Sequence, residues 1–201
     1  MEEKIFWLGH SSVMIKSDKV IYFDPWKLKK AEKADVVLIS HSHGDHFSPD
    51  DVGKVLKDGT VVVCPGDCSG LKAVILTVKP GDRIEANGVP VEAVPSYNTN
   101  KAFHPKANNW VGFIVTVEGK RIYYCGDTDF IPEMKQIRAD IVIAPVGGTY
   151  TMTAEEAANA VNAIKPELAI PIHYGDIVGS VKDAERFAGL CTVPVKIKKK
   201  I

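Results

Sequence analysis

The 201-residue sequence predicts an α+β protein in which two similar halves form a four-layer αββα sandwich, with two β-sheets face to face and helices outside. Two observations lead to this fold class. Short apolar runs rich in β-branched and aromatic residues, the pattern of buried strands, recur along the whole chain. The order of strands and helix starts in the first half also returns in the second half.

The predicted strands are mostly bounded by Gly, Pro, Asp or Asn, which favour turns. They are Ile5–Leu8, Val20–Phe23, Val36–Ile39, Val61–Cys64, Val89–Val94, Val111–Val117, Arg121–Cys125, Ile141–Ala144 and Leu168–Ile172. Two helices are expected between them. Ser48 has the position of an N-cap before Pro49 and two acids. Thr153 begins a second capping box, followed by an apolar face that ends at Pro166.

The internal repeat consists of three sequence matches that occur in the same order. "FWLGHSSVMIKSDKVIYFDP" resembles "NWVGFIVTVEGKRIYYCGD", and "KADVVLISHSHGDH" resembles "RADIVIAPVGGTY". "TVVVCPGD" and "ELAIPIHYGD" then follow the two predicted helices. We therefore expect residues 1–201 to form one domain of two similar halves, with a site at the edge where loops from both halves meet.

Composition narrows the classes of partner. Twenty-five basic and 25 acidic residues cancel, so nucleic acid and anionic membranes are not favoured. The N-terminal residues lack the pattern of a signal peptide, and no apolar stretch is long enough to cross a bilayer. We expect a cytoplasmic protein with a small-molecule substrate. A homo-oligomer is compatible with the sequence, which does not fix the oligomeric state.

Half of the chain's six histidines lie in one turn, directly after a predicted buried strand. The cluster is His41, His43, Asp45 and His46. In extended backbone His41 and His43 point the same way, because side chains alternate. Gly44 then permits a sharp bend that brings a carboxylate and a third imidazole to a neighbouring point. Imidazole and carboxylate groups bind transition metals, so the turn predicts a metal site.

His41-x-His43-x-Asp45-His46 resembles the HxHxDH motif of the metallo-β-lactamase fold, and this resemblance extends over essentially the whole chain. It implies two further metal ligands, Asp127 in "IYYCGDTD" and His173 in "LAIPIHYGD". By the same resemblance, His41 and His43 belong to one metal position. Asp45, His46 and His173 belong to the other position. Asp127 is shared between them, and Asp45 and Asp127 carry the catalysis.

The resemblance fails at one ligand of the first metal position. The family normally has a histidine where this chain has Asn98. Asn98 could ligate through its amide oxygen, a hard ligand that suits Mn²⁺ better than Zn²⁺. His104 could fold back and supply a nitrogen, or the first position could stay incomplete. The expected cofactors are therefore one or two divalent ions, Zn or Mn.

Among branches of the fold, the chain most resembles the group that includes ascorbate-phosphate lactonase. The segments that carry this resemblance are "WLGHSSVMI", "IYFDPW", "YYCGDTD", "PVGGTYTM" and "PIHYGD". It implies that Asp24 orients a metal ligand and that His10 does likewise or touches substrate.

The predicted function is that of a metal-dependent hydrolase, which uses metal-activated water on an ester, lactone or phosphoester of a small molecule. An RNA or DNA phosphodiesterase of the same fold is the nearest alternative. RNA-processing members usually carry an inserted domain, for which the interval from Asp127 to His173 leaves no room. A di-iron reductase of the fold is a further alternative, which the sequence disfavours because that branch typically has glutamate at the place of His43. A non-catalytic metal-binding sensor stays open, because Asn98 departs from the usual ligands.

Overall fold

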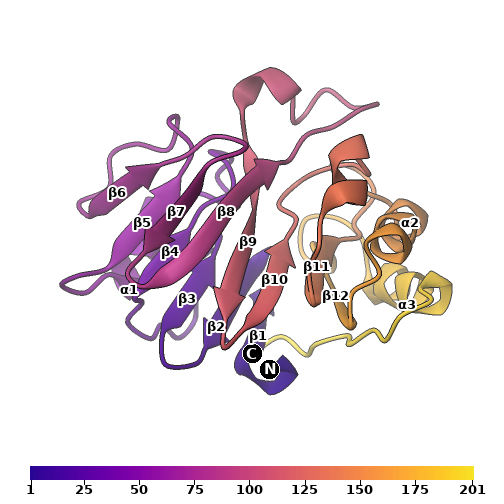
Figure 1. The fold of residues 1–201 in the computed structure, drawn as a ribbon, viewed down its shortest axis with the longest axis horizontal. Coiled ribbons are helices and arrows are strands. Elements are labelled where there is room, and N and C mark those ends of the chain that lie inside the picture. Colours follow the sequence, from indigo (N-terminus) through magenta and orange to yellow (C-terminus); the bar gives the residue numbers. More distant parts are fainter.

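The computed structural model describes residues 1–201 as two six-stranded sheets that face each other (Figure 1). The first sheet has the order β1-β2-β3-β4-β5-β6, with strands Ile5–Gly9, Ser12–Lys16, Val20–Phe23, Val36–Leu38, Val61–Cys64 and Val74–Thr77. The second has the order β12-β11-β10-β9-β8-β7. Its strands, from β7 to β12, are Arg83–Ala86, Val89–Pro95, Val111–Val117, Lys120–Tyr124, Ile141–Pro145 and Leu168–Ile172.

Both sheets follow the same plan. Strands β1 to β3 pair antiparallel, and β3 to β6 pair parallel. In the second sheet β7 to β10 pair antiparallel, and β10 to β12 pair parallel. The switch from antiparallel to parallel pairing in each half confirms the predicted α+β sandwich of two similar halves.

The helices lie on the outer faces of the sandwich, as predicted (Figure 1). They are α1 (Pro49–Val55), α2 (Ala154–Ile164) and α3 (Val181–Leu190), with 3₁₀ turns at Glu2–Lys4, Lys106–Asn108 and Pro132–Gln136. Ser48 caps α1 by accepting a hydrogen bond from the Asp51 amide, and Thr153 forms the expected capping box with Glu156. None of the helices combines the length and apolar character needed to cross a bilayer.

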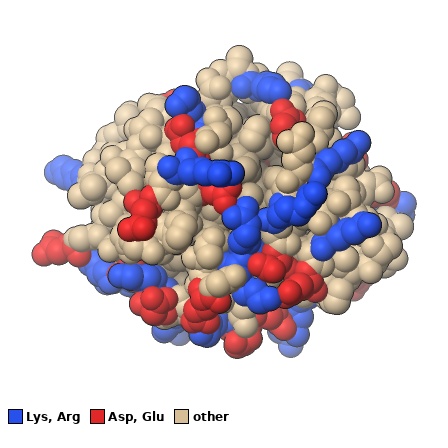
Figure 2. All heavy atoms as spheres, in the orientation of Figure 1, with Lys and Arg blue, Asp and Glu red and all other residues tan.

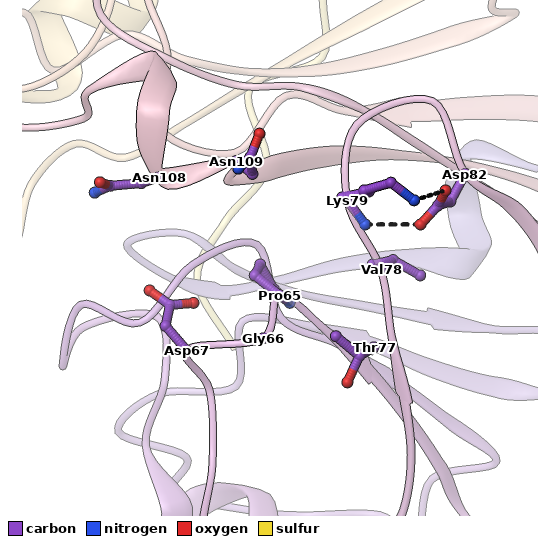
Figure 3. A pocket seen from close by; sticks show the side chains of 9 residues that line it. All are labelled: Pro65, Gly66, Asp67, Thr77, Val78, Lys79, Asp82, Asn108 and Asn109. Carbon is purple, nitrogen blue, oxygen red and sulfur yellow. Dashed lines mark hydrogen bonds and ion pairs between the residues drawn. The ribbon is translucent and has the colours of Figure 1, made fainter.

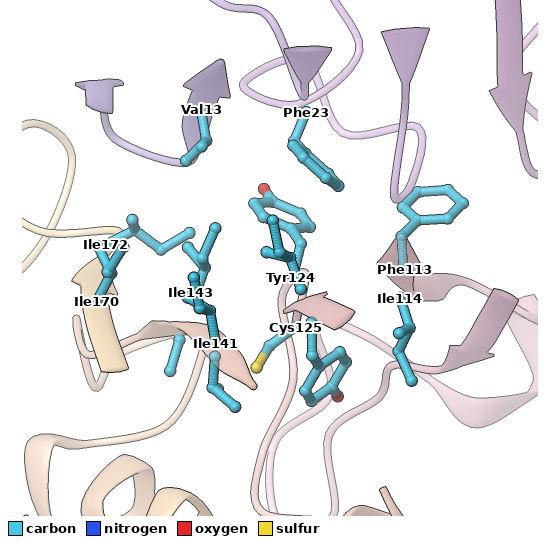
Figure 4. Close-up of a cluster of buried hydrophobic side chains, with 14 of the residues drawn as sticks. Val13, Phe23, Phe113, Ile114, Tyr124, Cys125, Ile141, Ile143, Ile170 and Ile172 are labelled. Carbon is cyan, nitrogen blue, oxygen red and sulfur yellow. The ribbon is translucent and has the colours of Figure 1, made fainter. Parts of the chain in front are cut away.

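The main hydrophobic core lies between the two sheets. Phe23 of the first sheet stacks on Tyr124 of the second, with ring centroids 4.8 Å apart. Figure 4 shows Val13 and Phe23 facing side chains of β10, β11 and β12. Burying a large apolar side chain contributes about 1.5–3 kcal/mol, so this core fixes the two sheets against each other and holds the loops at their shared edge in place.

Four elements were not predicted, namely β2, β6, β7 and α3. β6 and β7 bury little of their surface, and α3 buries only Ala184 and Phe187. The apolar patterns of β7 and α3 are therefore weak, whereas β6 has a clear apolar run, Val-Ile-Leu-Thr, that could have been predicted as a strand. β2 begins two residues after the bend at Gly9 and His10, which have positive φ angles of 115° and 49°. Gly9 and Ser11 are usual turn residues between the apolar runs of β1 and β2, so this tight hairpin could have been predicted from the sequence.

Candidate active site

Loops from both halves bring all six residues of the predicted ligand set to one edge of the sandwich. The loop after β4 carries His41, His43, Asp45 and His46, the loop after β10 carries Asp127, and His173 follows β12. The side chains form two adjoining groups around Asp127. The predicted location between the two halves therefore agrees with the geometry.

The first group contains His41, His43 and His104, whose ligand nitrogens lie within 4.8 Å of one another. His41 Nε2 is 3.2 Å from His43 Nδ1. The Trp110 ring packs against both, with centroids 4.9 and 4.8 Å away. His104, six residues beyond Asn98, thus provides the third imidazole of this group.

The second group contains Asp45, His46 and His173, together with His10. His10 Nε2 lies 3.0 Å from Asp45 Oδ2, and the His10 ring packs on His173 with centroids 4.0 Å apart. The His10 carbonyl accepts hydrogen bonds from Trp7 Nε1 at 2.8 Å and from the His173 amide at 2.9 Å. His10 therefore contacts both Asp45 and His173 directly.

Asp127 lies between the two groups. Its Oδ1 is 3.3 Å from His46 Nε2, and its Oδ2 is 3.0 Å from His173 Nε2 and 3.4 Å from His104 Nε2. The Asp127 carbonyl accepts a hydrogen bond from Ser96 Oγ at 2.9 Å, which anchors the loop. This is the position that the resemblance implied for a shared ligand.

Several buried polar atoms at this centre have no hydrogen-bond partner, despite their short separations. Among them are the Nε2 atoms of His46, His104 and His173, and Asp127 Oδ1. Burial of unpartnered polar atoms is costly, and these atoms converge on one place. Imidazole nitrogens with carboxylate oxygens are a donor set for Zn²⁺ and similar ions. The residues present thus fit a divalent metal.

The electrostatics of the imidazoles favour metal binding at the first group. Burial, with the neighbouring charge of His46, holds the pKa of His41 well below its usual value. Burial also lowers the pKa of His104 to about 4. Both rings are therefore neutral at pH 7, the state in which a histidine can ligate a metal.

The carboxylates are ionised at the same pH. Burial acts to raise the pKa of Asp127, but the charges of His173 and His46 outweigh it and hold that pKa well below its usual value. Burial also opposes ionisation of Asp45, and its hydrogen bond to His10 and the charge of His46 bring the pKa down to about 2. The ionised carboxylates supply negative charge for a cation, and, against the effect of burial, the charge of Asp127 raises the pKa of His46.

Asp24 lies buried beneath the centre and fixes His46. Its Oδ2 accepts from His46 Nδ1 at 2.6 Å, from Tyr124 Oη at 2.7 Å and from Ser40 Oγ at 2.5 Å. Its Oδ1 accepts from the Ser40 amide at 2.7 Å. Because the carboxylate binds the Nδ1 side of the ring, His46 Nε2 faces Asp127. Asp24 thus has the geometry of the orienting role that the resemblance implied.

Asp129 was missed as a site residue. It is buried and accepts hydrogen bonds from Asn98 Nδ2 at 3.1 Å, the Thr99 amide at 2.7 Å and Lys101 Nζ at 2.6 Å. These bonds shape the loop that leads to His104. The second acid of "GDTD" was the available signal for this residue. The role of Asp129 could not be inferred from this signal, because its partners lie about thirty residues earlier in the chain.

A pocket of about 350 Å³ opens onto this centre. Its lining is His43, Gly44, Asp45, Phe103, His104, Asp127, Tyr150 and Ile177. A larger pocket of about 530 Å³, lined by Pro65, Gly66, Asp67, Thr77, Val78, Lys79, Asp82, Asn108 and Asn109, contains no histidine (Figure 3). There Lys79 pairs with Asp82 at 3.0 Å. The candidate active site is therefore the smaller pocket, which the predicted metal ligands line.

Fold and centre together define a protein of the metallo-β-lactamase fold with a histidine- and aspartate-rich metal site. Residues 4–173 match the family of the Beta-lactamase superfamily domain. A UPF0173 metal-dependent hydrolase of Thermoplasma acidophilum is 34% identical, over 93% of this chain and 90% of its own. Another of Pyrococcus abyssi is 30% identical, over 96% and 94%. The chain belongs to this family of metal-dependent hydrolases, as its sequence motifs predicted.

Solved structures agree with this family. A candidate metal-dependent hydrolase of Parabacteroides distasonis superposes with a TM-score of 0.85 at 32% identity, covering 96% of this chain and 91% of its own. Igni18, a metallo hydrolase of Ignicoccus hospitalis, has a TM-score of 0.78 at 24% identity, covering 98% and 94%. At 24% identity, the likeness to Igni18 shows a shared fold.

Proposed function

We propose that this metal-dependent hydrolase cleaves an ester, lactone or phosphoester bond of a small molecule at the centre around Asp127. The convergence of unpartnered buried nitrogens on this carboxylate is the observation that supports the proposal. His41, His43 and His104 would hold one cation and Asp45, His46 and His173 a second one, with the Asp127 carboxylate between the two groups.

A divalent ion bound there would lower the pKa of a bound water from about 15.7 towards about 7, which provides a nucleophile at neutral pH. Asp45 lines the pocket and is ionised. Its Oδ2 is held by His10, which leaves Oδ1 to orient a water molecule beside Asp127. His10 in turn is fixed through its carbonyl, so it acts as a positioning residue for Asp45.

Zn²⁺ is the proposed metal ahead of Mn²⁺. The argument for manganese depended on ligation by the Asn98 oxygen, and that oxygen accepts hydrogen bonds from the His104 amide and His104 Nδ1. A position with three imidazoles suits zinc. The same geometry supports two metal ions per chain, because His104 completes the first group.

A small molecule remains the proposed substrate in preference to nucleic acid. Acidic side chains lie among the basic ones on the face that Figure 2 shows. The pocket lining contains neither lysine nor arginine. A nuclease needs cationic contacts along a phosphate backbone, and these features do not offer them.

The test is hydrolysis by protein reconstituted with Zn²⁺ or Mn²⁺, on panels of lactones, carboxylic esters and phosphodiesters. We expect turnover that a chelator abolishes and that Asp127→Asn lowers by at least about a hundredfold, since one cation contact is lost at each position. Asp58→Asn, at an exposed site, is the matched control. A metal-replete protein inert on every panel would contradict the proposal, as would salt-sensitive RNA cleavage as its sole activity.

A further inference from the structure

We infer that the pocket takes a substrate whose scissile bond is flanked by a compact, uncharged apolar group, and that Phe103 and Ile177 bind this group. The inference rests on the proposed function, and it concerns the group beside the scissile bond rather than the type of bond. It also assigns substrate selection to Phe103 and Ile177, two side chains outside the metal centre.

The first support is an apolar rim on an otherwise polar pocket. Phe103 and Ile177 are each 47% exposed, although large apolar side chains usually lie inside. Both line the pocket, together with Tyr150. The Phe103 ring packs edge to face on Tyr150, with centroids 4.7 Å apart, so it is held in an orientation that presents apolar surface.

The second support is the position of this rim relative to the metal centre. Phe103 directly precedes His104, and Ile177 lies in the loop that begins at His173. The apolar surface therefore adjoins both proposed metal positions. A substrate whose scissile bond lies at Asp127 would place a neighbouring substituent against Phe103 and Ile177, and burying that substituent removes apolar surface from water.

The third support is charge. The lining contains no lysine or arginine, and its only acidic side chains are the carboxylates Asp45 and Asp127 and the weakly acidic phenol of Tyr150. The lysines nearby are engaged elsewhere: Lys101 Nζ bonds Asp129 at 2.6 Å, Lys200 Nζ bonds Asp176 at 2.8 Å, and Lys27 Nζ lies 3.9 Å over the Trp26 ring. A phosphate substituent would be desolvated here without the basic partners that usually bind it.

The size of the pocket limits the substituent. A volume of about 350 Å³ is near the lower end of ligand sites, which span about 300–1,000 Å³. It accommodates a scissile group and one ring or a short alkyl chain, but not an extended polymer.

Three hydroxamates test the inference, because they share one chelating group and differ in the substituent. Zinc-loaded protein is titrated calorimetrically with acetohydroxamate, phenylacetohydroxamate and phosphonoacetohydroxamate. We expect the phenyl compound to bind about tenfold more tightly than the methyl compound, as burial of a ring against apolar side chains predicts. Phosphonoacetohydroxamate should bind no more tightly than acetohydroxamate.

The double variant Phe103→Ser/Ile177→Ser should reduce the advantage of the phenyl compound to less than about threefold and leave acetohydroxamate binding unchanged. Val74→Ser, at another exposed apolar residue, is the control and should keep the wild-type ratio. Equal affinity for methyl and phenyl, or preference for the phosphonate, would overturn the inference while leaving the metal site standing. Failure of all three compounds to bind would instead contradict the proposed function.

Discussion

Asn98 Oδ1 accepts two hydrogen bonds from His104, one from its backbone amide and one from Nδ1, each at 3.0 Å. Asn98 Nδ2 donates to Asp129 Oδ1 and to the Tyr150 carbonyl, which fixes which end of the amide is the oxygen. His104 must then carry its proton on Nδ1, and its free Nε2 lies 3.4 Å from Asp127 Oδ2. Asn98, which stands where the family normally has a histidine, thus orients His104.

Asn98→Ala should weaken metal binding at the first position by about 10–100-fold, because ligand-orienting partners typically contribute that much affinity. The affinity of the second position should change little. Competition with a chromophoric chelator measures both sites. Asn108→Ala, an exposed asparagine on the adjacent 3₁₀ turn, is the control. If Asn98→Ala bound metal with wild-type affinity at both positions, the orienting role of Asn98 would be refuted.

Asp24→Asn should lower the free energy of unfolding by about 1–3 kcal/mol, because four donors now surround the carboxylate and an amide leaves some of them unpaired. Asparagine tolerates the positive φ of 43° at this position, so the backbone should keep its path. Urea unfolding of the metal-free protein measures the loss. An Asp24→Asn midpoint equal to that of Asp58→Asn would argue against the hydrogen-bond network.

Gly147→Ala should displace His173 and reduce hydrolysis together with stability. A Cβ at Gly147 would lie 2.4 Å from the His173 carbonyl oxygen and 2.8 Å from Val178 Cγ2, so the loop must shift, at a cost of about 1–3 kcal/mol. Thermal unfolding and turnover measure the two effects. Gly53→Ala in α1 meets nothing within 4 Å and should be neutral or stabilising. Unchanged turnover in Gly147→Ala would show that His173 does not depend on this close approach.

Sequence patterns predicted the sandwich because its buried strands are strongly apolar and two helices begin with clear caps. The compact turn from His41 to His46 could be interpreted locally. The internal repeat led to the location of the site between the two halves, and the family resemblance led to Asp127 and His173. The choice between Asn98 and His104 could not be made in this way. It depends on the fold of a short loop, which Asp129 sets through bonds to Asn98, Thr99 and Lys101 across about thirty residues.

The same limit applies to the exposed elements and to the pocket. β7 and α3 bury too little to leave a strong periodic pattern, since solvent-facing positions accept many residue types. β6 is different, because its sequence Val-Ile-Leu-Thr is apolar although the strand is largely exposed. Phe103 and Ile177 are separated by more than seventy positions, and only the folded loops bring them to one pocket.

Metal content and position test the central claim most directly. Protein purified without added metal, then loaded with zinc, is analysed for stoichiometry, and anomalous diffraction locates the ions. The account predicts two ions per chain on either side of Asp127, one against His41, His43 and His104 and one against Asp45, His46 and His173. His104→Ala should retain only the second ion. A protein that binds no zinc, or holds it away from Asp127, would contradict the account.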